Sequence, residues 1–111
     1  IGELAADIEA ARQLIVRSVA TAGHDESAGG MDSLVGSAIS KVFSAELMER
    51  FGETALDILG PAATLSTGAA GAAPDGSFEQ FLRHSIMYVV GGGSAEIQRN
   101  VIAQRGLGLP R

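Results

Sequence analysis

The chain has 111 residues, enough for one small domain with a single hydrophobic core. It is 46% hydrophobic but only 5% aromatic, so Ala, Ile, Leu and Val are expected to build that core, and the absence of cysteine excludes disulfides and thiolate chemistry and suits a cytoplasmic protein. The net charge of −5 argues against nucleic-acid binding, which needs a basic surface, and no apolar run reaches the roughly 18 residues of a membrane span.

Residues 2–22 are expected to form the first helix. Apolar residues recur there at spacings of three and four and define one helix face: Leu4, Ile8, Ala11, Ile15 and Val19. Gly23 is suited to end this helix. Residues 24–31 then form a polar loop, in which we expect His24 to be solvated.

The second helix is expected to run from a cap at Asp32 or Ser33 to about Leu59, where Gly60-Pro61 ends it. One apolar stripe on it holds Ile39, Phe43, Leu47, Phe51, Ala55 and Ile58, and a second beside it holds Val35, Ala38, Val42 and Ala45. So wide an apolar surface predicts either a central helix with several neighbours or an oligomer interface. Its acidic residues are interpreted as a solvated face: Glu46, Glu49, Glu53 and Asp57.

Residues 60–76 are rich in Ala and Gly and form a long linker, of a length that is usually functional or disordered. The third helix is expected to begin at Ser77, which has capping-box spacing with Gln80. Its inward face holds Phe78, Phe81, Leu82, Ser85 and Val89.

After the glycine triplet Gly91–Gly93, a fourth helix is expected from about Ser94 to Arg105, with Ile97 and Val101 inward and Ile102 beside them. Helices with short connections and no strand pattern predict an all-α fold, an antiparallel four-helix bundle.

The segment Gly91-Gly92-Gly93-Ser94 holds the most chemical interest. It is either a simple turn between helices or a site whose backbone N–H groups bind an anion or a carbonyl oxygen, because glycine lets a ligand approach the main chain closely. A Walker phosphate loop is excluded, since no Gly-Lys-Ser/Thr follows. His24 and His84 lie far apart in the sequence without further ligands at helical spacing, so no metal site is expected.

Several segments resemble the acyl-CoA dehydrogenase family. Residues 93–103, Gly-Ser-Ala-Glu-Ile-Gln-Arg-Asn-Val-Ile-Ala, are similar to the family's C-terminal signature, and residues 4–12, 40–46 and 55–60 are similar to stretches of its preceding helices. The ending Gly-Leu-Pro-Arg resembles actinobacterial members. The resemblance implies that residues 1–111 are the C-terminal helical domain of a longer protein with an N-terminal helical domain and a middle β-domain.

The resemblance also implies an activity, the oxidation of an acyl-CoA thioester to a 2-enoyl-CoA with FAD as cofactor. An electron-transfer flavoprotein would accept the electrons, and the protein would be a homo- or hetero-oligomer. In the family a carboxylate removes the α-proton while the backbone N–H of the same residue donates to the thioester carbonyl. That position corresponds to Gly92, which keeps the N–H but lacks the carboxylate. The isolated domain is therefore expected to be inactive.

The missing base has three explanations under this resemblance. It stands on the helix preceding this chain, as in some branched-chain members, or the subunit is silent and pairs with an active one, as in heteromeric members that act on steroid side-chain CoA esters. Substitution by Glu96 is disfavoured, because Glu96 lies one turn further along.

The resemblance further implies that four residues occupy FAD-binding positions: Ser94, Glu96, Asp57 and Gly60. Asp57 and Glu96 replace glutamine or a similar residue, and a carboxylate is unfavourable beside a pyrophosphate. We therefore expect the FAD contacts of this domain to differ from those usual in the family.

Overall fold

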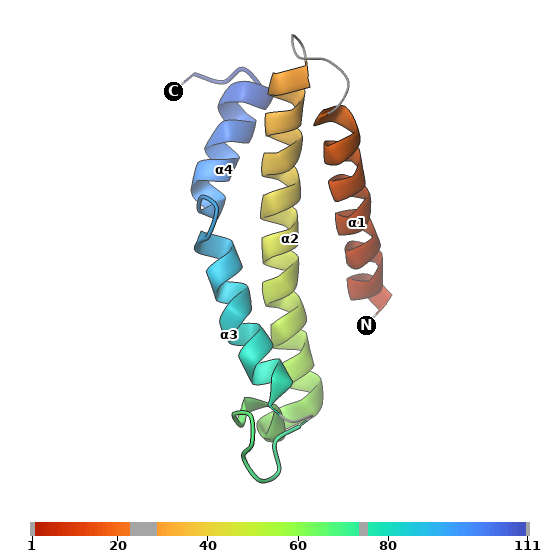
Figure 1. Ribbon diagram of the computed structural model, residues 1–111, viewed down its shortest axis with the longest axis vertical. Coiled ribbons are helices and arrows are strands. Elements are labelled where there is room, and N and C mark those ends of the chain that lie inside the picture. The colour runs from red at the N-terminus through yellow and green to blue at the C-terminus, as the bar shows by residue number, and fades with distance from the viewer. Residues whose placement is uncertain (1, 23–28, 74–75, 111) are drawn as a thin grey trace. The chain divides into compact units, whose positions relative to one another are not determined.

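The computed structural model describes residues 2–22, 29–73 and 76–110, and within them the side chains of all but residues 22 and 29–32. The elements in chain order are α1 (Gly2–Ala22), α2 (Gly29–Leu59), the 3-10 helix η1 (Gly60–Thr64), α3 (Ser77–Val90), α4 (Ala95–Val101) and the π-helical η2 (Ile102–Gly106) (Figure 1). The described residues contain no strand, so the predicted all-α class is confirmed. The predictions for Gly23 and His24 lie outside the described residues.

The chain divides into two compact units. The first comprises Ile1–Ser44 and Gly92–Arg111, and the second comprises Ala45–Gly91. Helix α2 therefore contributes its N-terminal part to the first unit and its C-terminal part to the second.

In the first unit, small side chains let α1 and α2 approach each other. Ala11 and Ala38 are buried, and a Cβ at Gly36 would lie 3.6 Å from the Ser18 Cβ. η2 also lies close to α2, because a Cβ at Gly106 would lie 3.0 Å from the Val35 Cγ1. The unit is thus packed through Ala, Gly and Ser rather than through large apolar residues.

The predicted inward face of α1 was only partly right. Its least exposed side chains are Leu4, Asp7, Ala11, Leu14 and Ser18. The neighbouring stripe is open to solvent, since Ile8, Ile15 and Val19 are 50%, 48% and 68% exposed. Periodicity finds the apolar side of a helix, but it does not tell which of two adjacent stripes a neighbour covers.

The second unit is held by contacts between α2 and α3. The rings of Phe51 and Phe81 meet edge to face with their centroids 5.4 Å apart. Gly52 is buried beside Leu82, whose Cδ1 would lie 2.8 Å from a Cβ at that position. The predicted inward face of α3 is confirmed, because Ser85 is fully buried and Phe78, Phe81, Leu82 and Val89 are half-buried.

Residues 60–73 form a folded loop rather than an extended linker. Ala63 of η1 is fully buried, and the Ala73 N–H donates to the Ala62 carbonyl oxygen at 3.0 Å, which ties the end of the loop to its beginning. Gly76 is buried at the start of α3 in a left-handed conformation, with φ of 75°. The described residues of this segment therefore favour a structured loop over a disordered one.

The predicted start of α2 was wrong, whereas α3 begins at Ser77 as predicted. α2 begins at Gly29, so Asp32 and Ser33 lie within the helix rather than at its N-cap. The N-cap of α3 is Gly76 rather than Ser77, and the Gln80 N–H donates to the Gly76 carbonyl oxygen at 3.3 Å, so the predicted capping box is not centred on an N-cap at Ser77.

The fourth helix is regular only as far as Val101 and continues as the π-helical η2 to Gly106. The predicted inward position of Ile97 was wrong, since this side chain is 56% exposed while Ala95 is 4% exposed. Ala95 and Gln98, three residues apart, turn inward instead.

Candidate functional site

The glycine triplet adopts a conformation that only glycine takes readily. Gly91 ends α3 with its N–H donating to the Met87 carbonyl oxygen at 2.7 Å. Gly92 and Gly93 follow with φ values of 70° and 94°, in the left-handed region where a side chain costs about 1–2 kcal/mol per residue. A Cβ at Gly92 would meet nothing within 4 Å, so the space beside this residue is open.

Ser94 caps the helix that follows this turn. Its extended backbone precedes α4, and its Oγ accepts a long hydrogen bond of 3.5 Å from the Ile97 N–H. The same hydroxyl donates to the Glu96 carboxylate and is the largest cause of a lowered pKa at Glu96. A hydrogen bond from the backbone N–H of Glu96 and, to a smaller extent, the charges of Arg99 and Lys41 lower that pKa further.

These contacts argue against Glu96 as a catalytic base. A carboxylate with a lowered pKa is a weaker proton acceptor than an ordinary one, and this carboxylate is already held at the first turn of α4.

Gln98 was not among the predicted site residues, yet it contacts the turn directly. Its Nε2 donates to the Gly92 carbonyl oxygen at 3.0 Å. A Cβ at Gly93 would lie 2.7 Å from that Nε2, so the amide occupies the space that glycine leaves free. The sequence shows that Gly93 stands five residues before Gln98 within the signature, but it does not show where the Gln98 side chain points.

Gly92, Ser94 and Glu96 therefore come together in one turn of the first unit. Asp57 and Gly60 lie in the second unit, at the end of α2 and the start of η1, with Asp57 exposed and Gly60 left-handed at φ of 66°.

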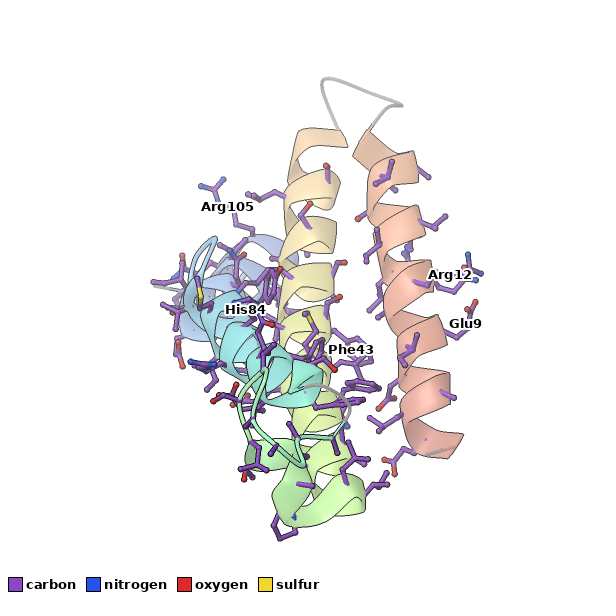
Figure 2. The ribbon with its side chains drawn as sticks, turned by 60° about the horizontal axis from the view of Figure 1, so that its bottom comes forward. Glu9, Arg12, Phe43, His84 and Arg105 are labelled. Atoms are coloured by element: carbon purple, nitrogen blue, oxygen red, sulfur yellow. The ribbon has the colours of Figure 1, made fainter. Side chains whose placement is uncertain are left out.

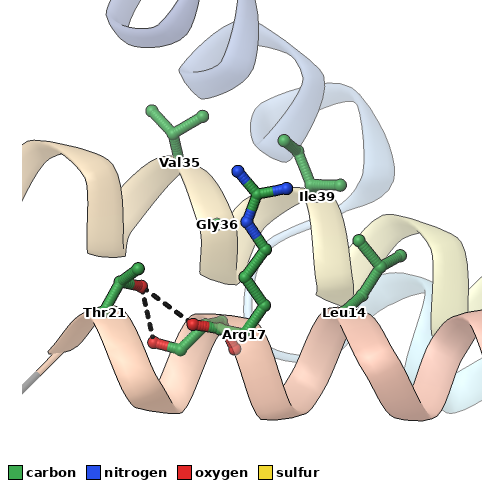
Figure 3. A pocket seen from close by; sticks show the side chains of 7 residues that line it. Leu14, Arg17, Thr21, Val35, Gly36 and Ile39 are labelled. Carbon is green, nitrogen blue, oxygen red and sulfur yellow. Dashed lines mark hydrogen bonds between the residues drawn. The ribbon is translucent and has the colours of Figure 1, made fainter.

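A cavity of about 280 Å³ lies between α1 and α2 in the first unit. Its apolar walls are Leu14, Val35 and Ile39, and Figure 3 shows the Arg17 side chain extending from α1 toward α2 between the last two. The hydroxyl of Thr21 donates to the carbonyl oxygens of Arg17 and Ser18, at 3.0 and 3.1 Å. The lining offers no paired acid and base, so this cavity is not a candidate catalytic site.

Charged side chains outside the turn form exposed local pairs. Glu9 and Arg12 lie side by side on α1 at 2.7 Å (Figure 2), and the hydrogen bonds from Arg12 and then Gln13 lower the pKa of Glu9 to about 2. Glu79 and Arg83 pair at 2.7 Å on α3, next to the exposed His84. Exposed pairs of this kind contribute little to stability or chemistry.

Among the described residues, no three His, Cys, Asp or Glu side chains gather as a metal site would require, and no described helix has the length and apolarity to cross a membrane.

Residues 1–107 match the acyl-CoA dehydrogenase C-terminal domain family. Acyl-CoA dehydrogenase FadE26 from Mycobacterium tuberculosis is 39% identical over 72 residues, which cover 65% of this chain and 18% of that protein. Acyl-CoA dehydrogenase IpdE1 from Mycolicibacterium smegmatis is 38% identical over 100 residues, which cover 86% of this chain and 22% of that protein. The chain thus spans about a fifth of the length of these relatives.

The crystal structure of the ChsE4-ChsE5 complex from Mycobacterium tuberculosis contains a chain of similar fold. The TM-score is 0.81 at 29% sequence identity, and the match covers 96% of this chain and 25% of that one. The structural similarity therefore extends over nearly all residues of this chain.

Proposed function

We propose that this chain, which belongs to the acyl-CoA dehydrogenase family, is the C-terminal helical domain of a flavin-dependent enzyme that oxidises an acyl-CoA thioester to the 2-enoyl-CoA. The observation that carries the proposal is the family match over residues 1–107. The proposed partners are an acyl-CoA substrate, an electron-transfer flavoprotein and further subunits of an oligomer, and the proposed location is the cytoplasm.

The role proposed for this chain in the reaction is electrostatic. The Gly92 N–H would donate to the thioester carbonyl oxygen, which stabilises the negative charge that develops there as the α-proton leaves. The open space beside Gly92 supports this role, because a substrate can approach the main chain at that point. FAD, when bound, would accept the hydride from the β-carbon.

The base that takes the α-proton must come from another residue. Gly92 has no side chain, and Glu96 is a weakened base held by Ser94. We therefore propose that the base is a carboxylate on the helix preceding this chain.

The residues proposed to contact FAD fit it only in part. The Ser94 hydroxyl and the backbone at Gly60 can each offer a polar contact to the cofactor. The carboxylates of Asp57 and Glu96 accept hydrogen bonds and carry negative charge, so they suit ribose hydroxyls and not a pyrophosphate. This chain would therefore contribute few of the contacts that bind the phosphates.

A second candidate function is that of a catalytically silent subunit in a heteromeric acyl-CoA dehydrogenase. The vacant position at Gly92 favours it, and the similar chain of known structure belongs to a complex of two different proteins. In this case the domain would serve assembly and would leave proton abstraction to its partner.

The two functions can be separated with the full-length protein. Flavin content and dehydrogenation are measured for the purified protein alone and together with a candidate partner subunit. Flavin retention with activity from the protein alone would exclude the silent subunit. Activity that requires the partner would support it, and the absence of flavin and activity in both preparations would refute both functions.

A substitution at the vacant position tests whether the turn faces the substrate. Gly92→Glu restores a carboxylate, and Gly92→Gln is its matched control, since both variants share the backbone strain of about 1–2 kcal/mol. In a protein that binds FAD but lacks a base, only Gly92→Glu should gain activity. No gain in a flavin-loaded Gly92→Glu protein that is otherwise inactive would show that position 92 does not face the substrate.

A further inference from the structure

We infer that Gln98 is a positioning residue, whose side-chain amide holds the Gly92 carbonyl and thereby orients the Gly92 N–H toward the thioester. This inference rests on the proposed function, which assigns that N–H to the substrate carbonyl. The contact itself, however, is a property of the turn and of α4.

Two observations define the contact. The Gln98 Nε2 donates to the Gly92 carbonyl oxygen at 3.0 Å, and it fills the space where a Cβ at Gly93 would lie, only 2.7 Å away. A side chain at position 93 would therefore displace the amide from the turn. Glycine at position 93 therefore leaves free the space that the Gln98 amide occupies.

The Gln98 side chain extends from the first part of α4, where the backbone is held by helical hydrogen bonds. Gln98 lies one helical turn after the Ser94 cap, and its own backbone N–H donates to the Ser94 carbonyl oxygen at 3.0 Å. The side chain therefore reaches back from α4 over the turn that precedes the helix. This arrangement ties the position of Gly92 to the start of α4.

The turn needs such a restraint because consecutive glycines have little conformational preference of their own. A peptide unit is planar, so holding the Gly92 carbonyl also fixes the direction of the Gly93 N–H. The Gly92 N–H lies in the peptide plane on the other side of the Gly92 Cα. With φ of 70° at Gly92, its direction is related to that of the held carbonyl. Without the amide, the N–H would be aimed at the substrate for only part of the time, which weakens its contribution.

The test uses the full-length protein and measures binding of two matched probes. One is a saturated acyl-CoA thioester, and the other is the alkyl-CoA thioether of the same chain length, which has no carbonyl oxygen; pairs of short, medium and long chain are used. The ratio of the two dissociation constants isolates the carbonyl contact, because all other contacts are shared. An ordinary hydrogen bond should favour the thioester by about 2- to 10-fold in the wild-type protein.

Gln98→Met keeps the length of the side chain but removes the donor, and Gln98→Glu keeps length and polarity but cannot donate when ionised. Both variants should bring the ratio close to one. Gln13→Met is the control, because it makes the same substitution at another glutamine whose Nε2 donates a hydrogen bond, to Glu9 at 2.7 Å. The control should leave the ratio unchanged.

A purely structural role for Gln98 would weaken binding of both probes equally, and an unchanged ratio in both Gln98 variants would overturn the inference. A wild-type ratio near one would refute the proposed carbonyl contact, and failure of all probes to bind would refute the proposed function. Either outcome would also refute the positioning role of Gln98.

The contact can also be tested without a ligand, through the stability of Gly93→Ala, Gln98→Met and the double variant. Because both changes remove the same hydrogen bond, Gln98→Met should cost less in the Gly93→Ala background than in the wild type. Additive effects would show that Gln98 does not hold the turn.

Discussion

Replacing Gly76 by alanine adds one methyl group at the point where the 60–76 loop meets α3. The added Cβ would overlap main-chain atoms of the loop, namely Thr67 N and, at 2.6 Å each, Ser66 C and Thr67 Cα. Main-chain atoms cannot rotate away as a flexible side chain can. The loop or the start of α3 must therefore move.

The magnitude follows from two contributions. At φ of 75° an alanine costs about 1–2 kcal/mol in backbone strain, of which the reduced freedom of the unfolded chain offsets about 0.4–1 kcal/mol. Forcing the added group into filled space costs about 1–3 kcal/mol more. We expect Gly76→Ala to lower the free energy of unfolding by about 2–4 kcal/mol.

Gly68→Ala provides the matched control. Gly68 lies in the same loop at φ of 84°, but a Cβ there would meet nothing within 4 Å, so only the strain remains and the expected cost is about 1 kcal/mol. Urea unfolding followed by circular dichroism measures both variants. Equal destabilisation of the two would refute the close packing of the loop against the start of α3.

Three further substitutions test other parts of the structure. Gly36→Ala should stabilise the protein by about 0.5–1 kcal/mol, since its Cβ would meet the Ser18 Cβ at an ordinary 3.6 Å. Gly52→Ala should bring no such gain, because Leu82 must move to admit the added Cβ. Thermal unfolding that shows Gly52→Ala to be the more stable variant would contradict the described packing. Glu9→Gln should slightly lower the free energy of unfolding at neutral pH. Because folding lowers the pKa of Glu9 from 4.5 to about 2, the difference in stability from wild type should be fully present above pH 4.5 and should disappear as the pH falls through 2. A difference in stability that does not change with pH would refute the pairing of Glu9 with Arg12. Ser94→Ala should lower the free energy of unfolding by about 0.5–1 kcal/mol through loss of the cap of α4. The same substitution should raise the pKa of Glu96 toward its ordinary value, as an NMR titration of the carboxyl would detect. An unchanged pKa would show that the Ser94 hydroxyl does not contact Glu96.

Much of the secondary structure could be predicted because it depends on local signals. The spacing of apolar residues located α1 and the inward face of α3, and the fourth helix was expected to begin at about Ser94, close to its start at Ala95. The start of α3 at Ser77 was predicted, but the start of α2 was missed because its sequence offers several acceptable caps within a few residues, and only packing selects among them.

The candidate site was predicted as a set of positions but not as a set of contacts. Gly92, Ser94 and Glu96 were named from the family signature, whereas the lowered pKa of Glu96 depends on where the neighbouring side chains point. Gln98 was missed for the same reason, since its contact with the Gly92 carbonyl joins residues six apart across a turn that no helical or strand period describes.

The sequence by itself determined the all-α class, the positions of the helices and the family, because apolar periodicity and an extended signature survive without coordinates. It also determined that position 92 has no carboxylate. Only the tertiary structure decided that alanines make up most of the buried apolar residues, which apolar stripe of α1 is covered, and that Gln98 fills the space left by Gly93. These features depend on distances between side chains and main chain, and a linear pattern of residue types does not contain those distances.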